Sequence, residues 1–189
     1  MSDAQSATTA PEADLIARAK SGDQRAFINL LEPAKDKAWG ICFYLTQNHS
    51  DARDALQEAT ALAWRNLDKF NGNARFSSWF YRIAANAAKA ILRKRKEEAS
   101  LDDEDNGLAH VLHAPGPSVG RQVEAKDLVE RILNSLPEKK RVALLLQVTA
   151  GLQVQEIADH LGMSLGSTKT MLSRTKAEIR AQFGGEITL

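Results

Sequence analysis

The sequence has little cysteine, few aromatic residues and no long apolar run. Cys42 is the only cysteine among 189 residues, which excludes a disulfide within the chain and argues against a multi-thiolate zinc site. A single thiol fits a reducing cytoplasm. No segment approaches the ~18 consecutive apolar residues that a membrane span needs. The first ten residues have neither a basic start nor an apolar run, so we expect no secretion signal and a cytoplasmic protein.

The composition is that of an ordinary globular protein, with 43% hydrophobic and 26% charged residues. Only 6% of the residues are aromatic, whereas Ala, Leu, Lys, Arg and Glu are frequent, which favours helices over sheet. The formal net charge of +1 says nothing about nucleic acid. The sequence therefore predicts an all-α protein whose binding surfaces depend on where the charges gather.

Apolar residues recur at helical spacing in two blocks, which predicts two small helical domains. We expect a disordered tail at 1–11, a first helical domain at 12–98 and a second at 121–189. The intervening segment, 99–120, contains an acidic run and a Pro-Gly-Pro triplet. These features predict a flexible, acidic linker.

Capping and breaking residues divide the first domain into helices. Asp23 is expected to cap one helix, and Pro33 is expected to kink or restart the next. Ser50 is a good N-cap for a helix from 51 to about 70. Asn71-Gly72-Asn73 is a turn signal, after which a helix is expected over about 76–96.

The segment from Val154 to Leu172 has the spacing of a helix-turn-helix. Ala158 supplies a small residue where the helices touch, Gly162 tolerates positive φ in the turn, and Ser164 is a natural N-cap. The second helix of such a motif lies in the major groove of DNA. Thr168 is more polar than its core position usually is. The alternative is an amphipathic hairpin with a solvated basic face.

The helix predicted after the turn carries seven basic residues between Arg75 and Lys96 and no acidic one. Arg75, Arg82, Lys89, Arg93 and Lys96 share one stripe away from the apolar face, which suits a polyanion. A solvated surface helix is the alternative.

An aromatic residue on this helix and the loop before it are further candidates for contact with nucleic acid. Trp79 lies on the apolar face, so a core position is favoured over a base-stacking platform. The polar loop from Asn71 to Arg75 has groups that can hold an unstacked base, although a plain turn explains its composition equally well.

The helix before that loop begins with an acidic face. Asp51, Asp54 and Glu58 share one side at spacings of three and four residues, with Gln57 beside them. A solvated acidic face near a helix N-terminus is the simplest interpretation. The chain's histidines do not group with a nucleophile, and no glycine loop suits phosphate, so we expect no enzyme activity, metal or cofactor. His110 and His113 lie in the predicted linker.

Several of these segments resemble one known family. The stretches 51–59, 63–70 and 76–84 are similar to region two of sigma-70-type factors, and 136–146 with 156–164 are similar to region four. The gap between the two regions is too short for another domain, which resembles the extracytoplasmic-function subgroup. The resemblance implies a region-two helical bundle and a region-four helix-turn-helix.

The resemblance also implies a role for each set of residues. Asp51, Asp54, Gln57 and Glu58 would bind core RNA polymerase. The minus-10 element would be bound by Asn71, Asn73, Arg75, Arg82, Asn86, Lys89 and Arg93. The minus-35 element would be bound by Ser167, Thr168, Lys169, Thr170, Ser173, Arg174 and Lys176.

The implied partners are the beta-prime clamp and beta flap of core polymerase, promoter DNA and an anti-sigma factor. The acidic linker would thread the RNA exit path. Two other classes stay open on the residues alone. One is a helix-turn-helix regulator that acts without polymerase, which would need neither the basic helix nor the acidic face. The other is a helical enzyme.

Overall fold

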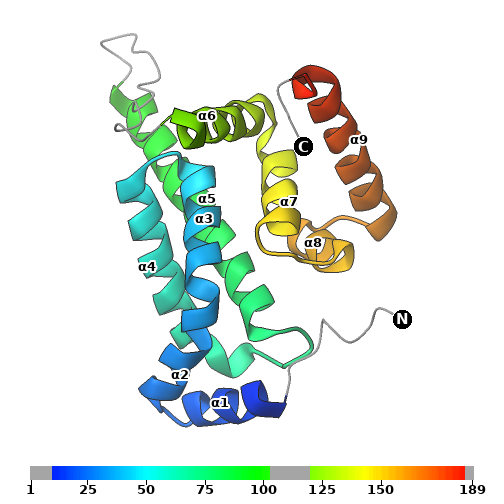
Figure 1. Ribbon diagram of the computed structural model, residues 1–189. Helices are drawn as coiled ribbons and strands as arrows, with labels where there is room; N and C mark the ends of the chain where they lie inside the picture. Colours follow the sequence, from blue (N-terminus) through cyan, green and yellow to red (C-terminus); the bar gives the residue numbers. More distant parts are fainter. Residues whose placement is uncertain (1–9, 103–119, 186–189) are drawn as a thin grey trace. The chain divides into compact units, whose positions relative to one another are not determined.

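The computed structural model describes residues 10–102 and 120–185. Within these ranges the chain is helical and contains no strand, so the predicted all-α fold is confirmed. The helices form two compact units, one of α1–α5 and one of α6–α9 (Figure 1). The predicted tail and linker fall mostly outside the described residues. The described helices reach into both, because α1 begins at Ala10 and α5 ends at Asp102.

The first unit is built around α3, α4 and α5, which pack against one another. Each turn of α4 places an alanine inward: Ala52, Ala55, Ala59 and Ala63 are all fully buried. Small side chains at spacings of three and four residues let neighbouring helices approach closely. The elements are α1 (Ala10–Lys20), α2 (Gln24–Leu31), η1 (Glu32–Ala34), α3 (Lys35–Thr46), α4 (His49–Arg65), η2 (Leu67–Lys69) and α5 (Phe76–Asp102).

The helix boundaries in this unit match two of the three predictions for capping and helix-breaking residues. Asp23 caps α2, since its carboxylate accepts hydrogen bonds from two backbone N–H groups. Pro33 lies in the 3-10 turn that separates α2 from α3, as predicted. The prediction that Ser50 caps α4 is wrong. Asn48 is the cap, because its Oδ1 accepts from the N–H groups of Ser50 at 2.8 Å and Asp51 at 3.0 Å.

The second unit contains α6 (Gly120–Ser135), α7 (Glu138–Val148), α8 (Val154–Leu161) and α9 (Leu165–Phe183). Its core is aliphatic, with Val142, Leu146 and Ile157 fully buried or nearly so. The contacts of α7 with both α8 and α9 make it the support of the last two helices. None of the described helices combines the length and apolarity that crossing a bilayer requires.

Candidate nucleic-acid and protein interfaces

The turn between α8 and α9 has the geometry predicted for a helix-turn-helix. Gly162 has a φ of 61°, and its neighbour Met163 donates a backbone hydrogen bond to Ala158 at 2.9 Å, which closes the turn. Ala158 is fully buried. Ser164 caps α9, because its Oγ accepts from the N–H of Ser167 at 3.1 Å. The prediction of this motif is confirmed at each of these positions.

The outer face of α9 carries most of the predicted upstream contacts. The exposed residues are Ser167, Lys169, Thr170, Ser173, Arg174 and Lys176. Thr168 is different, since its side chain is fully buried and its hydroxyl donates to the carbonyl of Ser164 at 3.0 Å. Thr168 therefore belongs to the core and leaves the set of candidate DNA contacts.

An ion pair between α7 and α9 adds to the positive character of the outer face. Lys140 lies 2.7 Å from the carboxylate of Glu178, the acidic residue among the basic side chains of α9. This pairing offsets the negative charge of Glu178 locally. The sequence pattern of α9 alone gave no sign of it, because Lys140 is 38 residues away.

The basic helix α5 is longer and less uniform than predicted. Its continuation to Asp102 brings Glu97 and Glu98 onto the same helix, 3.6 Å from Arg93 and Lys94 respectively. Exposed pairs of this kind are weak, so a phosphate can replace either carboxylate. Arg93 and Asn86 are exposed, whereas Arg82 and Lys89 are half-buried.

The loop between η2 and α5 is short and closed at its base by aromatic rings. The ring centroids of Phe70 and Phe76 are 6.0 Å apart. Within the loop, the N–H of Asn73 donates to Oδ1 of Asn71 at 3.1 Å, and Gly72 has a φ of 75°. Asn71 therefore shapes the turn and still lies exposed, together with Asn73.

Arg75 and Trp79 follow the loop and are both half-buried. The Nε of Arg75 is buried and has no hydrogen-bond partner in the structure. A donor in that state gains from an acceptor supplied by a bound molecule. Trp79 contacts Phe70 and Phe76, with ring centroids 5.1 and 5.6 Å apart. These contacts support its interpretation as part of the core.

The acidic face of α4 is only partly as predicted. Asp54, Gln57 and Glu58 are exposed. Asp51 is engaged, because its carboxylate lies 2.8 Å from the guanidinium of Arg95 on α5, and its side chain is only 22% exposed. Glu58 is also paired, since its carboxylate lies 2.9 Å from the guanidinium of Arg65, but both of these side chains are more than half exposed. The structure thus separates Asp51, which is held within the unit, from Asp54, Gln57 and Glu58 on the exposed side.

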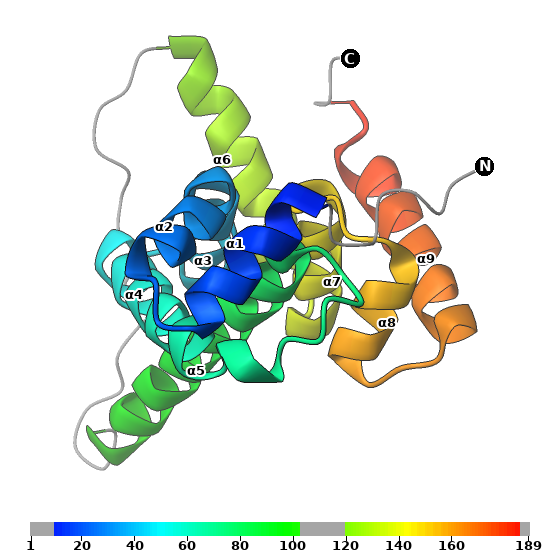
Figure 2. The same ribbon diagram turned by 90° about the horizontal axis from the view of Figure 1, so that it is seen from below.

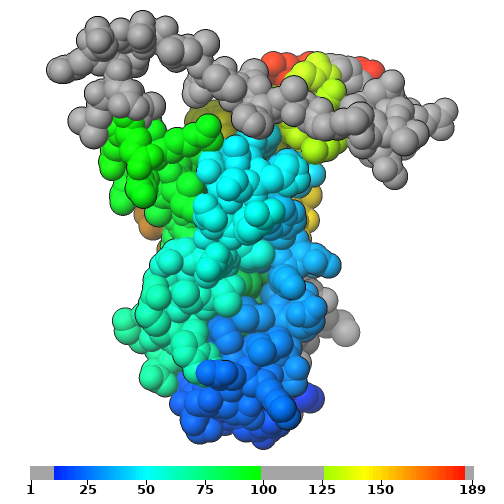
Figure 3. Space-filling view, turned by 90° about the vertical axis from the view of Figure 1, so that its left-hand side faces the viewer, coloured from blue at the N-terminus to red at the C-terminus, as the bar shows by residue number. Residues whose placement is uncertain are grey.

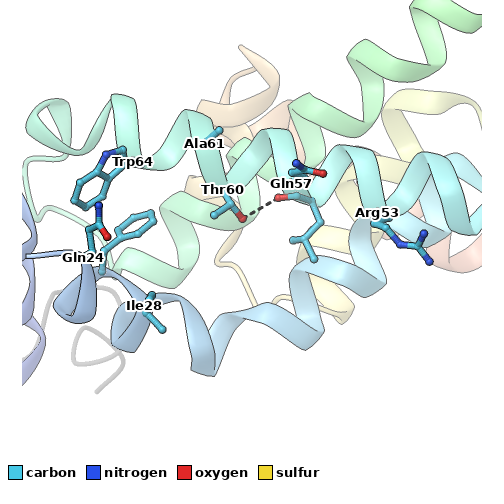
Figure 4. A pocket seen from close by; sticks show the side chains of 9 residues that line it. Gln24, Ile28, Arg53, Gln57, Thr60, Ala61 and Trp64 are labelled. Carbon is cyan, nitrogen blue, oxygen red and sulfur yellow. Dashed lines mark hydrogen bonds between the residues drawn. The ribbon is translucent and has the colours of Figure 1, made fainter.

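A groove between α2 and α4 adjoins this face and was not predicted from the sequence. Figure 3 looks onto the α4 side of the unit, and Figure 4 shows Ile28 of α2 opposite Gln57 and Thr60 of α4. The groove has a volume of 620 Å³, and Ile28 is 56% exposed. Its lining residues are Gln24, Phe27, Ile28, Arg53, Leu56, Gln57, Thr60, Ala61 and Trp64. An exposed apolar patch beside polar residues is typical of a protein-binding site.

The titratable groups of the described residues do not assemble into a metal site. No group of three or more His, Cys, Asp or Glu there is placed to hold a metal ion. The thiol of Cys42 is fully buried, and burial raises its pKa to about 12. It is therefore protonated at neutral pH and unsuited to act as a nucleophile.

Two helical units, one with a helix-turn-helix and one with a basic helix and an apolar groove, are the features of a two-domain DNA-binding protein. Family comparison agrees: residues 30–98 match sigma-70 region 2, and residues 126–179 match sigma-70 region 4. The chain belongs to the extracytoplasmic-function group of the sigma-70 family of RNA polymerase sigma factors.

Curated relatives span nearly the whole chain. The ECF RNA polymerase sigma factor SigW of Bacillus subtilis is 31% identical over 175 residues, which are 88% of this chain and 94% of that protein. The ECF RNA polymerase sigma-E factor of Escherichia coli K12 is 30% identical over 173 residues, or 87% and 90% of the two chains.

Solved structures share the fold at lower identity. CnrH, solved with the cytosolic domain of CnrY, has a TM-score of 0.67 and 23% identity, over 93% of this chain and 99% of its own. The sigma factor RpoE of Bartonella quintana, solved with the anti-sigma factor NepR, has a TM-score of 0.65 and 23% identity. That match covers 82% of this chain and 94% of the other.

Membership of this family sets the general role. The protein is an alternative sigma factor, a DNA-binding factor of transcription initiation, and is not an enzyme. Its partners are RNA polymerase and promoter DNA.

Proposed function

We propose that the surfaces described above bind different parts of a cytoplasmic initiation complex. The acidic face of α4 and the adjoining groove bind the beta-prime clamp of core polymerase. The loop 71–75 and α5 bind the melted minus-10 strand. The second unit reads the minus-35 element through α9 and contacts the beta flap.

The observation that carries this proposal is the separation of charge on the first unit. The exposed acidic residues of α4 are Asp54 and Glu58, with the neutral Gln57 beside them, whereas Arg93 and its basic neighbours are exposed on α5. A face of one sign attracts a partner of the other and repels the wrong one. The unit can therefore hold a protein through α4 and a polyanion through α5 at the same time.

An anti-sigma factor is the proposed regulator. Of the proteins that share this fold, CnrH has been solved with the cytosolic domain of CnrY, and RpoE with the anti-sigma factor NepR. The groove between α2 and α4 offers apolar surface from Phe27, Ile28 and Leu56 next to Gln57. A partner that fills the groove would cover part of the proposed polymerase site, so binding of the two would be mutually exclusive.

Reconstitution tests the proposal directly. The purified protein is mixed with bacterial core polymerase, and promoter-dependent transcripts are mapped by run-off sequencing. We expect transcripts to begin a short, fixed distance downstream of a shared pair of promoter elements and to disappear without this protein. The stand-alone regulator remains the second candidate, and tight sequence-specific duplex binding without any association with core polymerase would favour it.

A further inference from the structure

Helix α1 is bonded to both ends of the loop 71–75. The ammonium of Lys20 donates to the carbonyl oxygen of Phe70 at 2.7 Å and to that of Asp68 at 3.4 Å. The carboxylate of Glu12 accepts a hydrogen bond from the N–H of Phe76 at 2.8 Å. Phe70 directly precedes the loop and Phe76 directly follows it. Figure 2 shows α1 crossing this end of the unit beside the loop.

Glu12 and Lys20 act on opposite kinds of backbone group. Glu12 serves as a long-range cap of α5, because it satisfies a free N–H and places negative charge at the positive end of the helix. Lys20 satisfies carbonyls where the chain leaves η2. All three bonds join a charged group to a backbone group, and such bonds are stronger than neutral ones.

Helix α1 is itself fixed to the unit and can therefore hold the loop in place. Ile16 is 8% exposed and Ala19 is 2% exposed, so one side of α1 is buried. Arg18 is paired with Asp23, the cap of α2, at 2.8 Å. A packed helix is a more rigid support than a loop.

We infer that Glu12 and Lys20 are positioning residues that set the conformation of the loop 71–75 for base capture at the minus-10 element. This inference rests on the proposed function of the loop. Neither residue touches DNA in this scheme. They act by fixing the two points between which Asn71, Asn73 and Arg75 are displayed.

The test compares Glu12→Ala and Lys20→Met with the wild-type protein in reconstituted holoenzyme. The measurement is the extent of open-complex formation on the mapped promoter divided by the extent on promoter variants that carry single substitutions in the minus-10 element. This ratio is the discrimination of the holoenzyme. We expect this ratio to fall about two- to thirtyfold, which is the fold-change that corresponds to the loss of one helix cap. Core affinity and dependence on the upstream element should not change.

Matched variants separate positioning from general stability. Asp14→Ala alters an acidic side chain on the same helix that is 69% exposed and should leave the ratio unchanged. Lys20→Arg keeps a cationic donor and should retain most of the discrimination. Thermal unfolding of each variant sets an assay temperature at which all of them are folded, and Lys20→Met carries the test if Glu12→Ala does not fold.

The outcomes distinguish this inference from the function on which it rests. If Asn73→Ala and Arg75→Ala lower discrimination but Glu12→Ala and Lys20→Met do not, the positioning role is wrong and the loop assignment stands. If the loop variants themselves have no effect, the assignment of the loop fails. Equal losses in core affinity and in discrimination would show a general structural effect and also overturn the inference.

Discussion

The guanidinium of Arg95 lies 2.8 Å from the carboxylate of Asp51 and joins the basic helix to the acidic helix. Asp51 is also the third residue of α4, where its N–H is bonded to the Asn48 cap. Both roles are internal to the domain. We therefore expect Asp51→Asn to reduce core-polymerase affinity much less than Asp54→Asn, as measured by fluorescence titration.

The ion pair between Asp51 and Arg95 should contribute little to the stability of the fold. A double-mutant cycle of Asp51→Asn and Arg95→Gln should give a coupling energy of about 0.5 kcal/mol, since partly exposed ion pairs are weak and screened by salt. Urea unfolding at low and high salt measures it. A coupling of several kcal/mol that does not depend on salt would contradict this view of the pair.

Reversing the open charges of α4 should abolish core binding. With Asp54→Lys and Glu58→Lys together, we expect at least a tenfold loss of affinity, because like charges across an interface are strongly unfavourable. Circular dichroism should show an intact fold, since both residues are exposed. The charge-matched control is Asp14→Lys with Asp36→Lys, on exposed sites outside the face. Unchanged affinity in the first variant would overturn the clamp assignment.

Lys169 and Arg174 should contribute to use of the upstream element. Each change to Ala is expected to cost about 1–3 kcal/mol if the side chain reads a base, or to lower the salt dependence of binding if it contacts a phosphate. Holoenzyme binding to promoters with and without the upstream element measures both. Lys139→Ala, an exposed basic residue on α7, is the control. If all three changes affect promoter binding equally, α9 is not the helix that recognises the upstream element.

Thr168 and Thr170 should behave in opposite ways. Thr168→Val keeps the shape of a buried side chain and removes a hydroxyl bonded to the Ser164 carbonyl. That carbonyl keeps its backbone bond from the Thr168 N–H, so stability should change by less than about 1 kcal/mol. Promoter choice should not change. Thr170→Val, on the exposed face, should alter promoter choice with little effect on stability.

The Cys42 thiol provides a probe of unfolding. Its pKa is raised to about 12 by burial, so at pH 8 the folded chain should react with iodoacetamide only when it opens. Because the pKa of the thiol is higher in the folded chain, the protonated thiol adds to the free energy of unfolding. This contribution is complete below the unfolded pKa near 9 and is lost as pH rises toward 12. Rapid labelling of the folded protein would show that the site is open.

The sequence was sufficient where a local pattern decides the structure. Asp23, Pro33, Gly162 and Ser164 each act through their own backbone or a neighbour within a few residues, so their roles could be predicted. Ser50 was assigned wrongly because Asn48, two residues earlier, is an equally good cap. Local propensity does not choose between two such candidates.

Contacts between distant segments could not be predicted in this way. The groove needs the relative placement of α2 and α4, and the bonds of Glu12 and Lys20 to the loop span 64 and 50 residues. The burial of Thr168 follows from helical phase, and the sequence already indicated that it occupied a core position. The polar side chain nevertheless favoured a surface role that the packing excludes.

The alanine-lined inner side of α4 has a consequence for redesign. Alanine methyl groups line the fully buried side of α4, so the close packing of this side does not depend on exposed residues such as Asp54 and Gln57. Substitutions at those outward positions can change partner choice while the scaffold stays intact. Any larger side chain on the inner side would force the neighbouring helices apart and disturb every surface at once.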